Sequence, residues 1–173
     1  IEIKDDRAHV FFEDALHFND HFKARLGVRA DYDSLNGDTY FSPRSNFQYR
    51  PFANDKLKLT GGWNRYYANK LFAYALTDGI NDYSFKETRS SINDEWGNRT
   101  AYSSSNVKRS QLDTPFADES AFAIESHIGN LSTQLKYVHR DFQDQIKRNR
   151  ISTSPVIDEY NNAGKMLANT YTF

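Results

Sequence analysis

The chain has 173 residues, which suits one domain and is short for two. Its 22 basic and 23 acidic residues leave a formal net charge of -1, so nucleic acid and anionic membrane surfaces, which need a positive excess, are excluded as main partners. There is no cysteine, which excludes disulfide scaffolds, thiolate zinc sites and cysteine nucleophiles. No apolar run reaches the roughly 20 residues of a transmembrane helix. The sequence begins at Ile1 without a signal peptide, and we expect it to lie inside a longer precursor.

The aromatic content separates this polar chain from a disordered one. Aromatic residues make up 15% of the sequence, although only 38% of all residues are hydrophobic. Disordered chains are poor in aromatic residues. A barrel with a polar lumen uses aromatic surface without a thick aliphatic core, and the composition favours such a fold.

Alternation of apolar and polar residues is the strongest pattern in the chain. Residues 21–33 read HFKARLGVRADYD, so an apolar face that includes Leu26 lies opposite a charged face that includes Arg25. Period 2 held over about a dozen residues is strand geometry. The alternation recurs elsewhere with weaker contrast. We expect seven strands: Ala8–Leu16, His21–Asp33, Asn46–Arg50, Leu57–Asn64, Ser120–Ile128, Leu131–Tyr137 and Met166–Phe173.

Short and long connections alternate between these strands. The short ones contain the Asn, Asp and Gly residues that tolerate tight turns. The predicted fold is therefore all-β, an antiparallel up-and-down meander with its tight turns at one end, as in large transmembrane barrels with short periplasmic turns and long extracellular loops. The expected turns are Phe18–Asp20, Ala53–Asp55 and Gly129–Asn130, and the longer segments are Ser34–Ser42, Ala68–Pro115 and Asn149–Ala163.

The segment Ala68–Pro115 is too long to be structureless in a compact domain. A short helix or an inserted hairpin fits around Leu71–Leu76. The run Asp78–Asp82 lacks the register and the closing Glu of a calcium loop, so we interpret it as a polar turn. Because long loops usually carry function, we expect the whole segment to be an extracellular loop that contributes to ligand capture.

Three stretches resemble, in the expected order, the barrel of TonB-dependent outer-membrane receptors. VFFEDALHFNDHFKARLGVRADYDS (Val10–Ser34) resembles a strand with an F-x-E-D-like element that turns into one reading G-x-R-x-D. SPRSNFQYRPFANDKLKLTGGWNRYYAN (Ser42–Asn69) is similar to the family's S-P-R strand, periplasmic turn and outgoing strand. LDTPFADESAFAIESHIGNLSTQLKYVHRDFQDQIKR (Leu112–Arg148) is similar to its P-x-x-D-E strand, G-N turn and Y-V-x-R-x-x-x-D-x-I strand.

The resemblance implies that residues 1–173 are a partial barrel of about seven strands, where the family has about 22. The family's plug domain and TonB box are not found in these residues. The implied partners are outer-membrane lipid, the remainder of the barrel and its plug, the TonB complex acting through the plug, and a small-molecule nutrient. We expect a ferric siderophore or similar chelate before the family's other nutrients (haem, cobalamin, glycans), with no cofactor and no enzymatic activity.

A cluster of an arginine and aromatic residues closes the fourth expected strand. Trp63, Arg65, Tyr66 and Tyr67 form either an interfacial girdle or part of a ligand contact, because Arg and Tyr bind anionic or aromatic ligands. Alternation places Tyr66 on the lumen face and Arg65 on the apolar face, where it snorkels near the rim. The candidate ligand-binding residues are Arg65, Tyr66, Phe72, Tyr74, Tyr83 and Trp96.

No catalytic or metal-binding constellation stands out. The paired acids Glu13-Asp14 and Asp118-Glu119 are interpreted as lumen or rim residues and not as a glycosidase pair. The 5 histidines lack H-E-x-x-H spacing. Gly61-Gly62, inside a strand, indicates a bend or a close approach of another group.

Two other classes of protein remain open at this point. One is a soluble all-β module that binds carbohydrate or another ligand, and the other, more distant, is a glycosidase. The apolar face distinguishes the first from a barrel, because it meets lipid in a barrel and a second sheet in a sandwich. Strands longer than about ten residues with one charged face favour the barrel.

Overall fold

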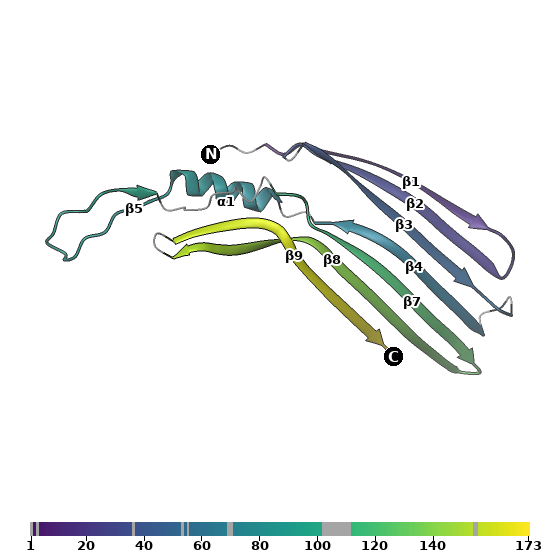
Figure 1. Ribbon diagram of the computed structural model, residues 1–173. Coiled ribbons are helices and arrows are strands. Elements are labelled where there is room, and N and C mark those ends of the chain that lie inside the picture. The colour runs from purple at the N-terminus through teal and green to yellow at the C-terminus, as the bar shows by residue number, and fades with distance from the viewer. Residues whose placement is uncertain are drawn as a thin grey trace.

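The computed structural model describes residues 2, 4–35, 37–52, 54, 56–68, 71–101, 112–153 and 156–173. It consists of one seven-stranded antiparallel sheet, with a helix and a small hairpin beyond one end (Figure 1). The sheet strands are β1 (Arg7–His17), β2 (Phe22–Asp33), β3 (Asp38–Tyr49), β4 (Leu57–Tyr67), β7 (Phe116–Ile128), β8 (Leu131–Thr153) and β9 (Val156–Thr172). The helix is α1 (Leu71–Tyr83), and the hairpin pairs β5 (Phe85–Lys86) with β6 (Thr100–Ala101).

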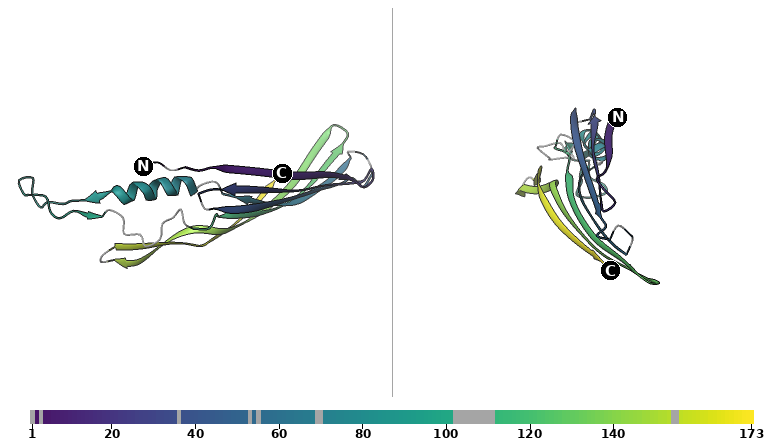
Figure 2. Two further views of the ribbon diagram at one scale, coloured as in Figure 1. Left: turned by 90° about the horizontal axis from the view of Figure 1, so that it is seen from above. Right: turned by 90° about the vertical axis from the view of Figure 1, so that its right-hand side faces the viewer.

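The strands of the sheet pair in chain order, β1-β2-β3-β4-β7-β8-β9, which makes the sheet a meander and confirms the predicted fold class. The connections from β1 to β2, from β3 to β4 and from β7 to β8 lie at one end of the sheet, which we call the turn end (Figure 1). Helix α1 lies past the ends of β4 and β7 at the opposite end, the α1 end, where the longer strands β8 and β9 extend as far as the helix does (Figure 1). The sheet is curved and leaves β1 and β9 as its two edges (Figure 2).

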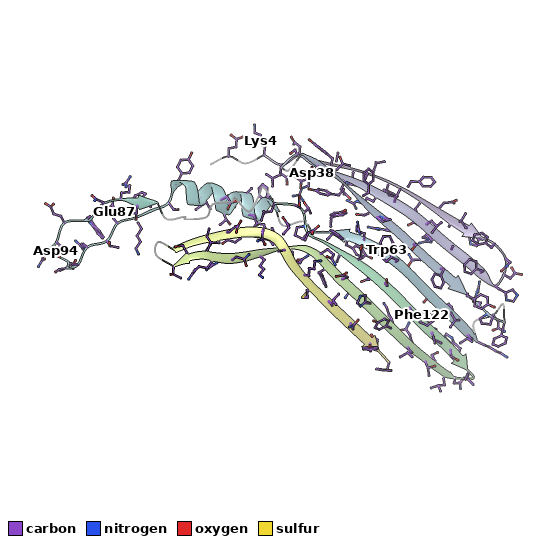
Figure 3. The ribbon with its side chains drawn as sticks, in the orientation of Figure 1. Lys4, Asp38, Trp63, Glu87, Asp94 and Phe122 are labelled. Carbon is purple, nitrogen blue, oxygen red and sulfur yellow. The ribbon has the colours of Figure 1, made fainter. Side chains whose placement is uncertain are left out.

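Between the turn end and the middle of the sheet, the register keeps most apolar side chains on one face and most charged side chains on the other. Residues that pair directly across neighbouring strands share a face. Leu26 pairs with Ser45, and Ser45 pairs with Trp63, so the apolar side of β2 continues across β3 and β4. Figure 3 shows Trp63 and, further along the sheet, Phe122 of β7. The apolar face includes Val10, Phe12, Ala24, Leu26, Val28, Phe41, Phe47, Trp63, Phe122, Ile124 and Leu135; the charged face includes His9, Glu13, Arg25, Arg29, Asp31, Arg44, Tyr66, Glu119 and Arg140.

A glycine in β4 makes room for an aromatic ring on the apolar face. Gly61 pairs with Phe47, and a Cβ atom added at Gly61 would lie 2.4 Å from Cζ of the Phe47 ring. The ring therefore lies against bare backbone. This agrees with the interpretation of Gly61-Gly62 as a place of close approach.

The side chains of the apolar face form a band that crosses the strands obliquely. On β2 and β3 it continues toward the α1 end as far as the paired residues Ala30 and Phe41. On β8 it stops earlier, at His139, whose side chain is hydrogen-bonded to that of Asn169 on β9 at 2.8 Å. A band inclined to the strands is the expected pattern where strands are tilted against a planar apolar layer.

Helix α1 has 13 residues, and no helix in the described part of the chain is long and apolar enough to cross a membrane.

Several expected connections differ from the structure. β3 already begins at Asp38, so the predicted loop Ser34–Ser42 is largely strand. Most of the predicted loop Asn149–Ala163 is also strand, because β8 runs to Thr153 and β9 starts at Val156. The helix expected around Leu71–Leu76 extends to Tyr83 and contains Asp78–Asp82, so the prediction of a polar turn there was wrong.

A β-bulge bends the hairpin of β8 and β9 toward the α1 end (Figure 1). Asp144 sits in it at φ 55°, a left-handed conformation that Asp tolerates better than most residues. Gly164 pairs with Gln145, and a Cβ atom at Gly164 would lie 2.5 Å from the Gln145 carbonyl oxygen. The Asn162 side chain donates to the Asp144 carbonyl oxygen at 2.7 Å and satisfies the backbone that the bulge leaves unpaired.

Candidate functional site at the α1 end of the sheet

The candidate site is a hollow where the sheet splits between β3 and β4. Pairing of these two strands ends at Arg44 and Asn64. Toward the α1 end, β3 continues to pair with β2 as far as Asp38, and β4 continues to pair with β7 as far as Tyr67. Side chains at the split, most of them from the charged face, line a hollow of about 310 Å³, which we call the split pocket.

Two contacts bridge the split. The rings of Tyr40 on β3 and Tyr67 on β4 lie 4.9 Å apart between centroids. Residues 112–115, which we call the strap, run to the start of β7, and within them the buried Thr114 donates its hydroxyl to the Tyr40 hydroxyl oxygen at 2.7 Å. The strap is also held from β9, because Asn162 exchanges two hydrogen bonds with the backbone of Asp113, at 2.8 and 3.0 Å. The strap thus connects β3 with β9 across the sheet.

Four arginines line the split pocket, and one of them differs in its partners. Arg44 of β3 is exposed, and among the described residues no carboxylate forms an ion pair with it. Its guanidinium carbon lies 6.0 Å from the centre of the Tyr66 ring. A guanidinium without an anionic partner, beside an aromatic ring, is suited to bind an anionic group. The other three are paired: Arg7 with Asp5 at 2.6 Å, Arg29 with Asp31 at 2.6 Å and Arg65 with Asp118 at 2.7 Å.

A second hollow of about 340 Å³, the aromatic pocket, adjoins the split pocket. Tyr66 and Tyr67 line both hollows. The remaining aromatic lining comes from three separate elements, Tyr74 of α1, Phe116 of β7 and Phe142 of β8. Phe142 pairs with Ala117, and Ala117 with Tyr66, so these three lining residues belong to the charged side of the sheet, whereas Tyr67 and Phe116, which pair with each other, belong to the apolar side.

The structure brings three of the six predicted site residues together at the two pockets. Tyr66 lies on the charged face, which was expected from the sequence to face the lumen of the barrel, and it lines both pockets. Tyr74 reaches the aromatic pocket from α1. Arg65 lines the split pocket, but its guanidinium is engaged by Asp118 and lies 4.2 Å from the centre of the Phe116 ring. The ligand contacts proposed for these residues stay predictions.

The other three predicted residues lie away from the two pockets. Phe72 and Tyr83 are on α1 and are exposed, Tyr83 to 77%. Trp96 lies between β5 and β6, in the hairpin segment of residues 84–101, which projects past α1 and in which Glu87 is labelled in Figure 3. The guanidinium carbon of Arg89 lies 4.4 Å from the centre of the Trp96 ring. These residues can take part in ligand capture only through a ligand or a loop that reaches them.

Reasoning from the sequence did not single out Arg44, Tyr40 or Phe142. The alternation does place Arg44 on the charged face, and it belongs to the S-P-R motif. Whether an arginine has a carboxylate partner, however, depends on which strands separate and where. The split between β3 and β4 is set by long-range pairing that leaves no mark in the local sequence.

The chemistry available at the site is that of binding. It combines a guanidinium that has no carboxylate partner in the described part of the chain with tyrosine hydroxyls and aromatic faces in two adjoining hollows. Within the described residues, no three His, Asp or Glu side chains come together as a set of metal ligands. Groups of this kind hold a planar, negatively charged small molecule by stacking and charge-assisted hydrogen bonds.

Comparison with known proteins connects this fold to the bacterial outer membrane. The chain is 34% identical, over 150 residues, to the uncharacterized protein YddB of Escherichia coli K12, a match that spans 84% of this chain and 17% of the relative. The crystal structure of the outer membrane transporter YddB superimposes with a TM-score of 0.73 at 26% identity over 96% of this chain and 21% of that chain. No protein-family model matches the chain.

Two further structures share the fold at lower identity. The ferric enterobactin receptor PfeA of Pseudomonas aeruginosa, a G324V mutant, matches 96% of this chain and 24% of its own, with a TM-score of 0.69 at 18% identity. The siderophore receptor PirA of the same organism matches 96% of this chain and 30% of its own, with a TM-score of 0.67 at 17% identity.

A curved meander with one apolar and one charged face, matched throughout to outer-membrane proteins, is a section of the wall of a transmembrane β-barrel. The chain belongs to the TonB-dependent outer-membrane receptors and forms part of their β-barrel in the bacterial outer membrane. This confirms the family and the location expected from the sequence.

The chain spans about a fifth of the length of the relatives that it matches, 17% of YddB in sequence and 21% in structure. The alternative of a soluble binding module is not favoured, because the structural relatives are outer-membrane transporters and receptors. Nor does a second sheet cover the apolar face in the described residues, where the only other sheet is the hairpin of β5 and β6.

Proposed function

We propose that the receptor to which this chain belongs takes up a scarce nutrient across the outer membrane, and that the split pocket and the aromatic pocket form part of its ligand site. Family membership supports transport as the activity. PfeA and PirA, which share the fold, are described as receptors for ferric enterobactin and for siderophores. A ferric siderophore, or a similar chelate with aromatic rings and negative charge, is the ligand class that we propose.

The observation that carries this choice of ligand is Arg44 beside Tyr66. Most cationic groups at the split pocket are neutralised by a carboxylate within the chain, whereas Arg44 has none among the described residues. An anionic ring system placed here gains a charge-assisted hydrogen bond from Arg44 and stacking contacts from Tyr66. In the adjoining aromatic pocket, Tyr74 and Phe142 offer further ring contacts.

In the complete receptor, the two faces of the sheet have different partners. The apolar face contacts outer-membrane lipid, and the charged face surrounds the plug and the ligand. Release of the ligand into the periplasm is driven by the TonB complex acting on the plug. The segment Ala68–Pro115, with α1 and the hairpin of β5 and β6, is the extracellular loop. This assignment leaves no covalent chemistry to the barrel.

Uptake of an iron-loaded catecholate siderophore, ferric enterobactin, tests the proposal. The full-length receptor is expressed in a bacterial host that lacks its own receptors of this class, and uptake of radioactive iron is measured with and without a protonophore. We expect saturable uptake that stops when the protonophore removes the energy supply. A host with the empty vector gives the background.

Binding is measured separately on the purified receptor by quenching of tryptophan fluorescence. Ferric enterobactin, a ferric hydroxamate and an uncharged oligosaccharide serve as the three probes. If the oligosaccharide alone binds and is taken up, the ligand class is wrong while the transport function stands. If none of a broad nutrient panel is taken up by a receptor that is assembled at the cell surface, the transport function itself fails.

A further inference from the structure

Helix α1 carries an apolar stripe that the rest of the described chain leaves uncovered. Phe72, Leu76, Ile80 and Tyr83 are exposed to 39, 42, 48 and 77%. Their spacing of four, four and three residues places them on one side of the helix. We call this set the α1 stripe. A contiguous exposed apolar strip on a helix indicates a surface that another element covers.

The opposite side of α1 is the side that packs on the protein. Ala75 and Asp78 are buried, at 9 and 8% exposure. Tyr74 lines the aromatic pocket over Tyr66 and Phe142, on the charged face of the sheet. At 100° per residue, the centre of this packed side is more than a quarter turn from the α1 stripe. The stripe therefore lies opposite the buried side of the helix.

This orientation excludes membrane lipid as the covering partner. Lipid meets the apolar face of the sheet, whereas Tyr74 of α1 lines a pocket with Tyr66 and Phe142 of the charged face, and α1 lies past the ends of β4 and β7 (Figure 1). The ligand is also a poor match for the stripe. Three of its four side chains have no polar atom, and a site for a scarce polar nutrient needs placed donors and acceptors.

An outer connection of the same receptor is the partner that fits. The chain spans about a fifth of the relatives that it matches, so most of the strands that close such a barrel, with their outer connections, lie outside these residues. Closing the barrel brings those connections to the rim where α1 stands. Within this chain, residues 102–111 read YSSSNVKRSQ and are too polar to be the apolar counterpart.

We infer that the α1 stripe is an interface on which an apolar segment of another extracellular loop of the same receptor packs. This loop holds α1 on the side of the stripe, while Tyr74 holds it on the opposite side. The helix thereby becomes a rigid wall of the aromatic pocket. The inference rests on membership of the receptor family and not on the identity of the ligand.

Cysteine labelling of the full-length receptor tests this interface, since residues 1–173 contain no cysteine of their own. Leu76→Cys and Ile80→Cys are compared with Ile92→Cys, whose parent side chain lies in the hairpin segment and is exposed to 77%. Each variant is exposed to a membrane-impermeant maleimide in intact cells without ligand, and rates are scaled to the urea-unfolded receptor. We expect labelling at positions 76 and 80 to be slower than at position 92 by about tenfold or more, as in the water-excluding centre of an interface.

Each result that contradicts the inference shows either that something else covers the α1 stripe or that nothing covers it. Equal rates at the three positions overturn the inference, because the stripe is then open to water. If positions 76 and 80 are protected from labelling only when ferric enterobactin is added, the ligand covers the stripe. If the protection is lost when receptor copies are separated by dilution in detergent, a second copy of the receptor covers it. Both results overturn the inference, while uptake of ferric enterobactin would still be measurable and would test the proposed function separately.

A charge substitution gives a second, independent readout. Leu76→Glu should increase hydrogen exchange in at least one outer loop outside residues 1–173, because a carboxylate buried at the interface without a partner is strongly unfavourable unless the loop separates. Ile92→Glu is the matched control and should leave those loops unchanged. If Leu76→Glu alters exchange only within α1, no outside loop packs on the stripe.

Discussion

The guanidinium of Arg65 donates two hydrogen bonds to the carboxylate of Asp118, at 2.8 and 2.7 Å. The two residues pair across β4 and β7 on the apolar side of the sheet. Their side chains are 29 and 25% exposed, and the Phe116 ring lies beside the guanidinium. Arg65 thus joins β4 to β7 where the sheet has already lost the pairing of β3 with β4. Arg65 therefore contributes mainly to the stability of the sheet, and Arg44 is the cationic residue of the site that is available to a ligand.

Removing either partner of this pair should destabilise the barrel without a large effect on ligand binding. We expect Arg65→Ala and Asp118→Ala each to lower the free energy of unfolding by on the order of 1–2 kcal/mol, because a half-buried charge loses its hydrogen-bonded partner. The double variant should cost less than the sum of the two. Urea unfolding of the full-length receptor in detergent measures this, and a loss of affinity for ferric enterobactin in Arg65→Ala of tenfold or more would instead assign Arg65 to the ligand.

Replacing Arg44 should weaken ligand binding while assembly is preserved. Loss of a charge-assisted hydrogen bond to an anionic ligand is expected to raise the dissociation constant about tenfold or more in Arg44→Ala, with partial recovery in Arg44→Lys. Arg25→Ala is the matched control, because Arg25 is an arginine on the same face, is paired with Glu13 at 3.5 Å and lies outside the split pocket. Equal affinities in Arg44→Ala and Arg25→Ala would remove the basis for an anionic ligand at this pocket.

The parts of the fold that follow from the sequence are those in which the two faces of a strand meet different surroundings. Between His21 and Asp33, one face of the strand is apolar and the other is charged, so the alternation is strong and the strand was predicted nearly to the residue. Beyond the apolar band this contrast disappears. The run Asn149–Ala163 is strand on both sides of the β8–β9 turn, but its few apolar residues do not alternate regularly with polar ones, and it was therefore mistaken for a loop.

The candidate site was predicted in part for a similar reason. Tyr66 and Tyr74 are aromatic residues next to or within a long connection, a pattern visible in the sequence, and both line the aromatic pocket. The importance of Arg44 comes from the lack of a carboxylate partner among the described residues, which depends on the split between β3 and β4. No local pattern records where two strands part, so neither the split pocket nor its unpaired guanidinium could be predicted.

The assignment of the two sheet faces predicts opposite effects for neighbouring residues of β2. Leu26→Arg and Ala24→Arg place a charge on the apolar face and should cost about 2–4 kcal/mol near the bilayer midplane, which reduces assembly. Arg25→Ala, between them on the charged face, should assemble normally. Heat-modifiable migration of the full-length receptor on gels reports assembly, and equal losses at the three positions would show that the faces are assigned wrongly.

Asn162 should keep both the strap and the β-bulge of β8 and β9 well ordered. Its amide donates to the carbonyl oxygens of Asp113 and Asp144 at 2.8 and 2.7 Å. In Asn162→Asp both donors are lost and a carboxylate faces two carbonyl oxygens, so local opening should become easier by about 1–3 kcal/mol. Hydrogen exchange of the full-length receptor should quicken in residues 112–115 and 142–146 but not at the β1–β2 hairpin. Unchanged exchange in both segments would mean that Asn162 does not hold them.

Shortening the segment Ala68–Pro115, which we propose to be an extracellular loop, should separate ligand capture from barrel assembly, provided that the strap is kept. Deletion of residues 71–111, with a short glycine-rich turn in their place, removes α1 and the hairpin of β5 and β6. It preserves the backbone hydrogen bond from Ala68 to the Pro115 carbonyl oxygen at 2.8 Å and the contact of Thr114 with Tyr40.

We expect this variant to reach the cell surface in near-normal amount, because the sheet and the strap keep their contacts, and to lose most uptake of ferric enterobactin because Tyr74 no longer covers the aromatic pocket. A longer deletion, of residues 69–115, also removes the strap and should lower the surface amount as well. Surface antibody labelling and uptake of radioactive iron measure the two effects on the same cells. If the shorter deletion takes up ferric enterobactin with unchanged affinity, the segment is not part of the binding element and the site lies on the barrel wall alone.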